Sequence, residues 1–135
     1  MAATSTARVP GFVGTPDSNP ENAPFWQACT EGRLVVRACE ACGRAHWYPR
    51  AICPHCMSER TVWKDAAGTG TIYSYSHAVR AEVPYVIAYV TLAEGPTMLT
   101  NIVDCDPATL KVGQAVRVTF VPTDSGPPVP MFTPA

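Results

Sequence analysis

The chain has 135 residues and a mass of 14.5 kDa, a size that allows one domain with a single modest core. Its net charge is −1, which disfavours a protein that coats nucleic acid, and its longest apolar runs are far shorter than the ~20 residues of a membrane helix. Only 16% of the residues are charged, which predicts an unusually apolar surface of the kind found at interfaces. The first residues lack the apolar segment of a secretory signal, so we expect a cytoplasmic protein whose six cysteines are thiols or metal ligands.

Residues 1–21 are rich in Pro, Gly and Asn, which predicts a flexible N-terminal arm. A short helix is expected over residues 24–31, with Asn22 as its N-terminal cap and Gly32 in the left-handed conformation that ends many helices. A strand follows it in the prediction. We therefore interpret residues 22–66 as one unit, a helix followed by a cysteine-rich segment.

Two CxxC elements ten residues apart dominate that segment, Cys39-Glu-Ala-Cys42 and Cys53-Pro-His-Cys56. Each CxxC places two sulfurs on one side of a tight turn, and two such turns supply four thiolates at the corners of a tetrahedron. Four cysteines leave no position for water or substrate, so the pattern predicts a structural zinc ion, with rubredoxin-like iron as the alternative metal. We expect His55, which lies inside the second element, to be exposed to solvent and not to bind the metal.

Signals for strands prevail from Gly70 onward, and they predict a barrel over residues 67–122. A helical turn capped by Asp106 is expected before the last of these strands. Short antiparallel strands with one helical insertion are typical of a small closed barrel such as the OB-fold, and the predicted fold class is mainly β. The expected strands cover residues 72–79, 85–92, 98–103 and 116–122.

The C-terminal residues 123–135 are rich in proline and yet apolar. One interpretation is a frayed tail. The other is a segment that docks on a partner, because Val129, Met131 and Phe132 are poorly suited to water and prolines reduce the entropy lost on binding.

The order of short motifs along the chain resembles a known family. These motifs are Phe25-Trp26, Glu31-Gly32-Arg33-Leu34, Cys39-x-x-Cys42-Gly43, Tyr48-Pro49-Arg50, Cys53-Pro54-x-Cys56, Gly68-x-Gly70-Thr71-Ile72-Tyr73-Ser74, Pro84-Tyr85-Val86, Glu94-Gly95, Leu99-Thr100-Asn101, Val112-Gly113 and Pro130-x-Phe132. They are similar to those of the zinc-ribbon plus OB-fold proteins known as domain of unknown function 35, which are associated with acyl-CoA metabolism. The resemblance runs from about residue 24 to residue 135. It implies an N-terminal helix, a rubredoxin-like zinc ribbon and a five-stranded OB-fold barrel.

The resemblance also implies a function. Members of the family are small partners of thiolase-superfamily enzymes, among them thiolases and thiolase-like aldolases, and the catalytic residues lie on the partner. This chain is therefore expected to be a non-catalytic accessory subunit that stabilises the complex and shapes the acyl-CoA channel. A CoA thioester would be the substrate of the complex, and a 2+2 hetero-tetramer is the expected assembly.

Six residues are candidates for contacts with CoA or with the partner. A guanidinium group can bind a CoA phosphate or a partner carboxylate, and aromatic side chains are enriched at interfaces. The alternatives are a structural salt bridge for the arginine and, for the aromatic side chains, filling of the seam between ribbon and barrel. The candidates are Arg50, Tyr48, Trp47, Tyr85, Met131 and Phe132.

Two other classes of function stay open. Zinc ribbons and OB-folds both bind nucleic acid, and Tyr73, Tyr75 and Tyr89 could stack on bases, although a pI near 6.3 and only two lysines weigh against it. An independent enzyme would need a catalytic constellation that the sequence does not display. The two cysteines outside the CxxC elements, Cys29 and Cys105, are expected to be small buried apolar residues.

Overall fold

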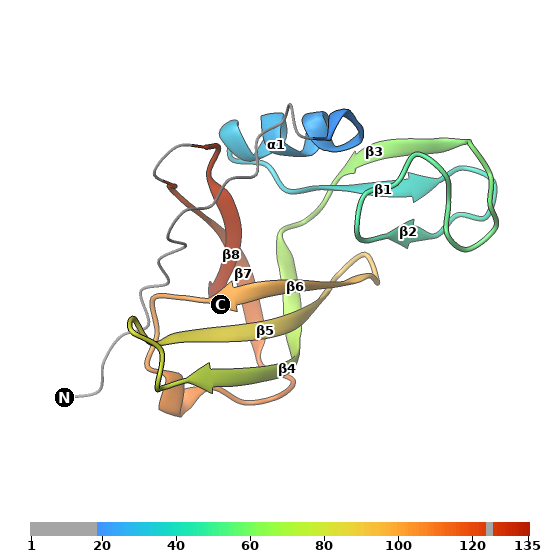
Figure 1. Cartoon of the computed structure of the whole chain (residues 1–135). Coiled ribbons are helices and arrows are strands. Elements are labelled where there is room, and N and C mark those ends of the chain that lie inside the picture. The colour runs from blue at the N-terminus through green and yellow to red at the C-terminus, as the bar shows by residue number, and fades with distance from the viewer. Residues whose placement is uncertain (1–18, 124–125) are drawn as a thin grey trace.

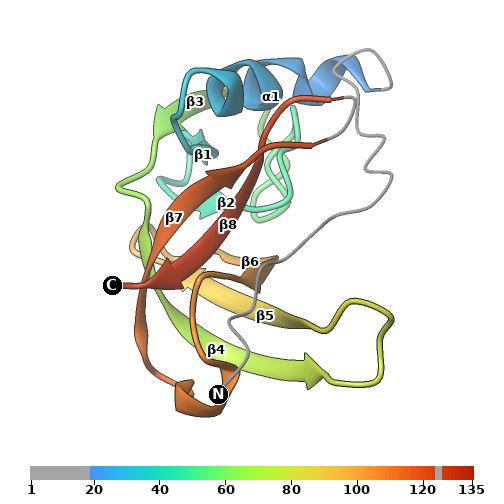
Figure 2. The ribbon, with the colours of Figure 1, turned by 90° about the vertical axis from the view of Figure 1, so that its left-hand side faces the viewer.

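The computed structural model describes residues 19–123 and 126–135. Most of the predicted arm lies outside these residues. Figure 1 and Figure 2 show a helix and a small sheet at one end of the molecule and a barrel at the other. Within the described ranges, no helix has the length and the apolar character that crossing a bilayer requires.

The helical segment begins with a 3-10 turn, η2 (Pro20–Asn22), which leads directly into α1 (Ala23–Thr30). The prediction that the Asn22 side chain caps α1 is wrong: its Oδ1 atom accepts no hydrogen bond from the helix, because the backbone of Asn22 is itself in the helical region and not in the extended conformation of a capping residue. Its amide nitrogen donates to the hydroxyl of Tyr48. The predicted end of the helix is confirmed, since Gly32 follows it with a φ of 76°.

The cysteine-rich segment forms a three-stranded antiparallel sheet in the order β2-β1-β3. The central strand, β1 (Val35–Cys39), pairs along its whole length with β3 (Thr61–Asp65), whereas β2 (Ala45–His46) is only two residues long. Val35 and Val36 are 4% and 0% exposed, as expected for β-branched residues on a central strand. The short β2 leaves most of the intervening segment to loops.

Five strands close the barrel in the order β4-β5-β6-β8-β7, and β4 pairs with β7 to complete it. All neighbours are antiparallel except β6 and β8. A 3-10 turn, η3 (Pro107–Thr109), lies between β6 and β7, with the predicted cap from Asp106. The strands are β4 (Thr69–Ala78), β5 (Tyr85–Leu92), β6 (Thr97–Ile102), β7 (Ala115–Val121) and β8 (Val129–Pro134).

One apolar core joins the parts of the molecule. Buried side chains of α1 and β1, such as Phe25 and Val36, belong to the same cluster as the inward side chains of the barrel. Alternation along β5 supplies Val86, Val90 and their buried neighbours to this cluster, and the intervening side chains point outward. The ribbon and the barrel are therefore held by a shared core and not by a flexible linker.

The position of β8 corrects the prediction of a docking tail. Residues Val129–Pro134 form β8, which pairs with β7 along nearly its whole length, from Val121 opposite Val129 to Val116 opposite Pro134. Met131 and Phe132 are 1% and 0% exposed, so these two side chains contact the interior and not a partner. The physical reason is that β6 and β7 would otherwise expose unpaired edges, and β8 covers both. The barrel thus continues beyond residue 122.

Candidate metal centre and partner contacts

The two CxxC turns have the same backbone structure. In the first, the Gly43 N–H donates to the Cys39 carbonyl at 2.8 Å. In the second, the Met57 N–H donates to the Cys53 carbonyl at 2.9 Å. Gly43 and Met57 both have positive φ angles, of 76° and 66°. This conformation reverses the chain directly after the second cysteine and leaves both sulfurs of each turn on one side.

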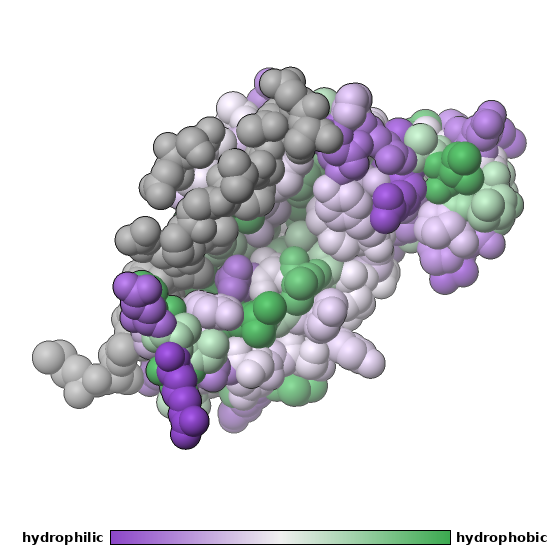
Figure 3. Space-filling model, in the orientation of Figure 1, coloured by the Kyte–Doolittle hydropathy of each residue, from purple (hydrophilic) through white to green (hydrophobic). Residues whose placement is uncertain are grey.

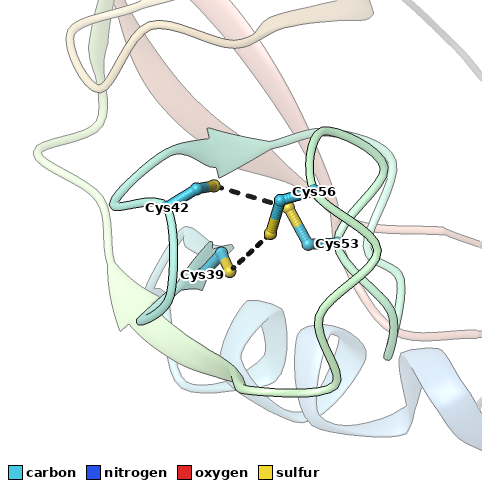
Figure 4. Close-up of side chains that lie close together, drawn as sticks. All are labelled: Cys39, Cys42, Cys53 and Cys56. Atoms are coloured by element: carbon cyan, nitrogen blue, oxygen red, sulfur yellow. Dashed lines mark hydrogen bonds between the residues drawn. The ribbon is translucent and has the colours of Figure 1, made fainter.

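The ribbon brings the four predicted sulfurs together (Figure 4). The Cys39 and Cys56 sulfurs are 3.6 Å apart, and all four lie within 4.8 Å of one another. A regular tetrahedron around zinc with Zn–S bonds of about 2.3 Å has edges of about 3.8 Å, so this spacing fits one metal ion at the centre. The remaining short sulfur–sulfur contact, of 3.7 Å, joins Cys42 and Cys53.

The acidity of the thiols agrees with a cation at this position. The backbone N–H groups of Cys42 and Ala41 favour the Cys39 thiolate and lower the pKa of Cys39 to about 6. At Cys56, the backbone N–H of Ser58 also favours the thiolate, but desolvation and the neighbouring cysteines outweigh it and the pKa of Cys56 rises to about 12. Four adjacent sulfurs cannot all ionise without a compensating charge, which a divalent metal ion supplies.

The donor set makes the centre structural. Four cysteine ligands complete a tetrahedral site and leave no open position for a substrate. His55 contributes its backbone N–H, which donates to the Cys53 sulfur at 3.4 Å, and its ring is not among the grouped ligands. The site therefore fixes the end of β1 to the second CxxC turn, as a staple for a sheet with few residues.

His46 has a structural role that the sequence analysis missed. Its ring is 3% exposed, and the Arg50 N–H donates to its Nε2 atom at 3.3 Å. Burial lowers the pKa of His46, which favours the neutral ring. The contact holds the loop between residues 46 and 50 in place. A ring and a backbone N–H four residues apart leave little trace in sequence, so no pattern could have revealed it.

That loop carries three of the candidate contact residues. Trp47 is half-buried and packs on Phe25 of α1, with ring centroids 4.9 Å apart, so its contacts are with the core. Tyr48 is 41% exposed, and the Arg50 guanidinium lies 5.6 Å from the centre of its ring. Tyr48 and Arg50 thus form an exposed pair. Neither of the two ion pairs among the described residues includes Arg50.

The other three candidates lie elsewhere. Tyr85 begins β5 on the outer side of the barrel, opposite Ala78 of β4. Met131 and Phe132 are buried on β8, as described above. The structure therefore brings Tyr48 and Arg50 together and leaves Tyr85 on a different surface.

A cleft of about 610 Å³ separates the ribbon from the turn between β5 and β6. Its volume falls within the range of roughly 300–1,000 Å³ that small-molecule sites occupy. The ribbon forms one wall of the cleft and the turn between β5 and β6 forms the other. The width of the cleft is therefore fixed by the core that the ribbon and the barrel share. The lining residues are Gly43, Arg44, Ala45, His46, Trp47, Pro54, His55, Glu94, Gly95, Pro96 and Thr97.

The two remaining cysteines are unsuited to nucleophilic chemistry. Burial raises the pKa of Cys29 to about 12, and this side chain is 1% exposed. Burial and, more weakly, the carboxylates of Asp106 and Asp104 raise the pKa of Cys105. A nucleophilic cysteine has a lowered pKa. Cys29 is a buried apolar residue, as predicted, whereas Cys105 is only half-buried.

Comparisons with known proteins agree with this architecture. Residues 26–62 match the family described as ChsH2, rubredoxin-like zinc ribbon domain, and residues 63–121 match ChsH2, C-terminal OB-fold domain. A DUF35 domain-containing scaffold protein of Methanothermobacter thermautotrophicus is 35% identical to the chain over 94 residues, which are 64% of this chain and 71% of the relative. The chain belongs to the DUF35 family. Its closed barrel is accordingly an OB-fold, and its sheet is a zinc ribbon.

Two further relatives of this DUF35 protein bear on its assembly. A probable enoyl-CoA hydratase alpha subunit of Thermomonospora curvata is 37% identical over 125 residues, or 89% of this chain. The chain spans only 39% of that relative's length. A solved structure described as Ltp2-ChsH2(DUF35) aldolase superimposes with a TM-score of 0.76 at 36% identity, covering 86% of this chain and 95% of the matched one.

Proposed function

We propose that this DUF35 protein is a non-catalytic accessory subunit of a thiolase-superfamily enzyme that makes or breaks C–C bonds in acyl-CoA substrates. The observation that carries the proposal is the 36% identity to a chain of the Ltp2-ChsH2(DUF35) aldolase, 95% of which is covered. The scaffold name of a relative at 35% identity points in the same direction. On this proposal the catalytic residues belong to the partner, and the cytoplasmic complex is a 2+2 hetero-tetramer.

The chemistry of the described residues supports a non-catalytic role. The cysteines either belong to a closed four-sulfur site or have raised pKa values, so none of them is activated for attack. The metal site is proposed to hold zinc, with rubredoxin-like iron as the alternative. In either case the ion stabilises the ribbon and takes no part in the reaction of the partner.

The exposed pair of Tyr48 and Arg50 is the proposed contact for CoA or for the partner. Arg50 is exposed, and its guanidinium group lies 5.6 Å from the centre of the Tyr48 ring. Guanidinium groups bind phosphates through paired hydrogen bonds. Neither Tyr48 nor Arg50 lines the cleft described above. The cleft of about 610 Å³ has the size for part of an acyl-CoA molecule. The ribbon and the barrel would then shape the acyl-CoA channel from opposite sides.

The test is co-expression of the full chain with each thiolase-superfamily enzyme of its own organism. We expect one enzyme to co-purify in equal ratio, with a mass by light scattering that fits two copies of each chain and with about one zinc ion per accessory subunit. Separate elution of every enzyme would overturn the proposal. Binding of a single-stranded oligonucleotide at low salt, where electrostatic attraction is strongest, would favour the nucleic-acid alternative instead.

The contact proposed for Arg50 has its own test in the purified complex. Arg50→Ala is expected to raise the KM for the acyl-CoA on the order of tenfold, which is the value of one charge-assisted hydrogen bond. Arg60→Ala is the matched control, because Arg60 is an exposed arginine on the same ribbon. Equal KM values for the two variants would remove Arg50 from the CoA site.

A further inference from the structure

One side of the barrel carries no charged side chain. The outward residues of β4, β5 and β6, all of which the structure describes, lie in rows set by the strand register, and none is Asp, Glu, Lys or Arg. In the whole chain 16% of the residues are charged, so this side is distinct. Three of these rows, together with Tyr73, are named the uncharged barrel face: Ser74–Tyr89–Leu99, Ser76–Ile87–Asn101 and Ala78–Tyr85.

The centre of this face is apolar and open to solvent. Tyr89 and Leu99 lie opposite each other and are 47% and 51% exposed. Tyr73 is 68% exposed, because it is the extra residue of a β-bulge between Ile72 and Ser74 that turns it outward. Figure 3 shows apolar side chains gathered over β5 and β6. Contiguous apolar surface of this kind marks a protein interaction site.

The uncharged barrel face contains a hollow, and the size of this hollow limits which group it can bind. Its volume is about 290 Å³, at the lower end of the range of roughly 300–1,000 Å³ for small-molecule pockets, and it suits a single large side chain. Two serines are the main polar groups of its lining. The lining residues are Ser74, Tyr75, Ser76, Ile87, Ala88, Tyr89 and Leu99.

The backbone at the centre of the face, on β5, cannot take up a further strand. β5 pairs with β4 on one side and with β6 on the other, so its N–H and C=O groups are already bonded. A partner must therefore contact this centre through side chains. Charged residues lie around the margin, at Arg80 and Glu82 in the turn after β4 and at Asp104 after β6, and all three are exposed. An apolar centre with a polar rim is the usual anatomy of a protein interface.

We propose that the uncharged barrel face is the docking surface for the partner enzyme, which contributes an uncharged patch and one aromatic side chain that fills the hollow. This inference rests on the proposed function and adds to it the surface through which the partner enzyme binds. Charge complementarity selects the occupant, because an acidic or basic surface would lose the hydration of its charges against this face without gaining an ion pair. The same argument excludes the phosphates of nucleic acid.

The decisive experiment places a charge at the centre of the face. Leu99→Lys is compared with Val112→Lys, since Val112 is a 68%-exposed apolar residue in the turn before β7, off the face. Binding of each variant to the purified partner enzyme is measured by titration, after thermal unfolding has shown that both fold. We expect Leu99→Lys to raise the Kd by about 100-fold or more, and Val112→Lys to change it less than about twofold.

A second measurement keeps the inference falsifiable if Leu99→Lys does not fold. Tyr89 is replaced by the photo-crosslinking residue p-benzoylphenylalanine, which retains an aromatic ring, and the complex is irradiated. A crosslink to the enzyme subunit supports the docking surface. A complex that forms but tolerates Leu99→Lys and gives no crosslink overturns the surface and leaves the proposed function standing.

Other outcomes distinguish failure of the proposed function from failure of the docking surface. If no thiolase-superfamily enzyme binds the wild-type chain, the proposed function fails and the occupant named here fails with it. If the wild-type chain alone is a dimer by light scattering and Leu99→Lys makes it a monomer, the face belongs to a second copy. Oligonucleotide binding by the wild-type chain that Leu99→Glu abolishes would assign the face to nucleic acid.

Discussion

Gly43 and Met57 occupy the same position in the two CxxC turns, one residue after the second cysteine, with φ angles of 76° and 66°. Glycine adopts this left-handed conformation without steric cost, whereas a residue with a Cβ atom pays roughly 1–2 kcal/mol. Met57 is also 73% exposed, so burial does not offset the strain. The second turn therefore stores strain that the first does not.

Met57→Gly is expected to increase the free energy of unfolding by about 0.5–1 kcal/mol, because it removes this strain and little packing. Gly43→Ala provides the reciprocal case: a Cβ atom at Gly43 would meet nothing within 4 Å, so its expected loss of about 1 kcal/mol is purely conformational. Denaturant unfolding at a fixed free zinc concentration measures both. A less stable Met57→Gly variant would mean that the methionine side chain packs more usefully than its exposure indicates.

Cys42→Ser tests the metal centre. Loss of one thiolate from a closed four-sulfur site should abolish stable zinc binding and destabilise the ribbon, since structural zinc contributes on the order of 10 kcal/mol in small domains. Cys105→Ser is the control, because Cys105 is a half-buried free cysteine outside the site. Metal content by mass spectrometry and a thermal scan are the measurements. Equal zinc content in the two variants would contradict the four-cysteine assignment.

The metal centre could be predicted from sequence because its geometry is local. Within each CxxC turn the two sulfurs are three residues apart, so the chain itself brings them to one side. Met57 shows the limit of that reasoning: glycine is the residue type expected at a positive φ angle, as at Gly43, whereas a methionine in the same position gives no such signal. The positive φ angle of Met57 could be predicted from its position one residue after the second cysteine, but not from its residue type.

Residues that depend on long-range pairing were the least predictable. A Pro-rich, apolar C-terminus is equally compatible with a tail and with a strand, and only the unpaired edges of β6 and β7 decide for the strand. The sequence therefore points Met131 and Phe132 to a partner, although Phe132 packs in the main core and Met131 in a second buried cluster with Val103. The uncharged barrel face was equally hidden, because it requires the register of three strands that are separate in sequence.

Phe132→Ala tests the finding that the C-terminal residues form a barrel strand and not a docking tail. Phe132 is fully buried in the core shared by α1, β1 and the barrel, so truncation should lower the free energy of unfolding by about 3–5 kcal/mol. The exposed Val112→Ala is the control, expected within about 0.5 kcal/mol of wild type. Denaturant unfolding checks both. A Phe132→Ala protein that is as stable as the control but fails to bind the enzyme would restore the docking tail.

His46 should make stability depend on pH. Burial lowers the pKa of the folded ring below its usual 6.5, so below that pH the unfolded chain binds more protons than the folded one. The free energy of unfolding should therefore fall as pH decreases from 6.5. Release of zinc at acid pH acts in the same direction, so the measured quantity is the difference in pH slope between wild type and His46→Gln. Identical slopes would exclude His46 as the titrating group.

Tyr48→Phe tests how the start of the helical segment is held. Asn22 is 1% exposed, its amide nitrogen donates to the Tyr48 hydroxyl, and its Oδ1 atom has no partner. Removing the hydroxyl leaves a buried donor unsatisfied, which should lower the free energy of unfolding by about 1–3 kcal/mol. Tyr85→Phe is the matched control, since Tyr85 points outward from β5, and it should be neutral in the isolated chain. If both variants unfold like wild type, solvent must reach Asn22 and the contact does not anchor η2 to the ribbon loop.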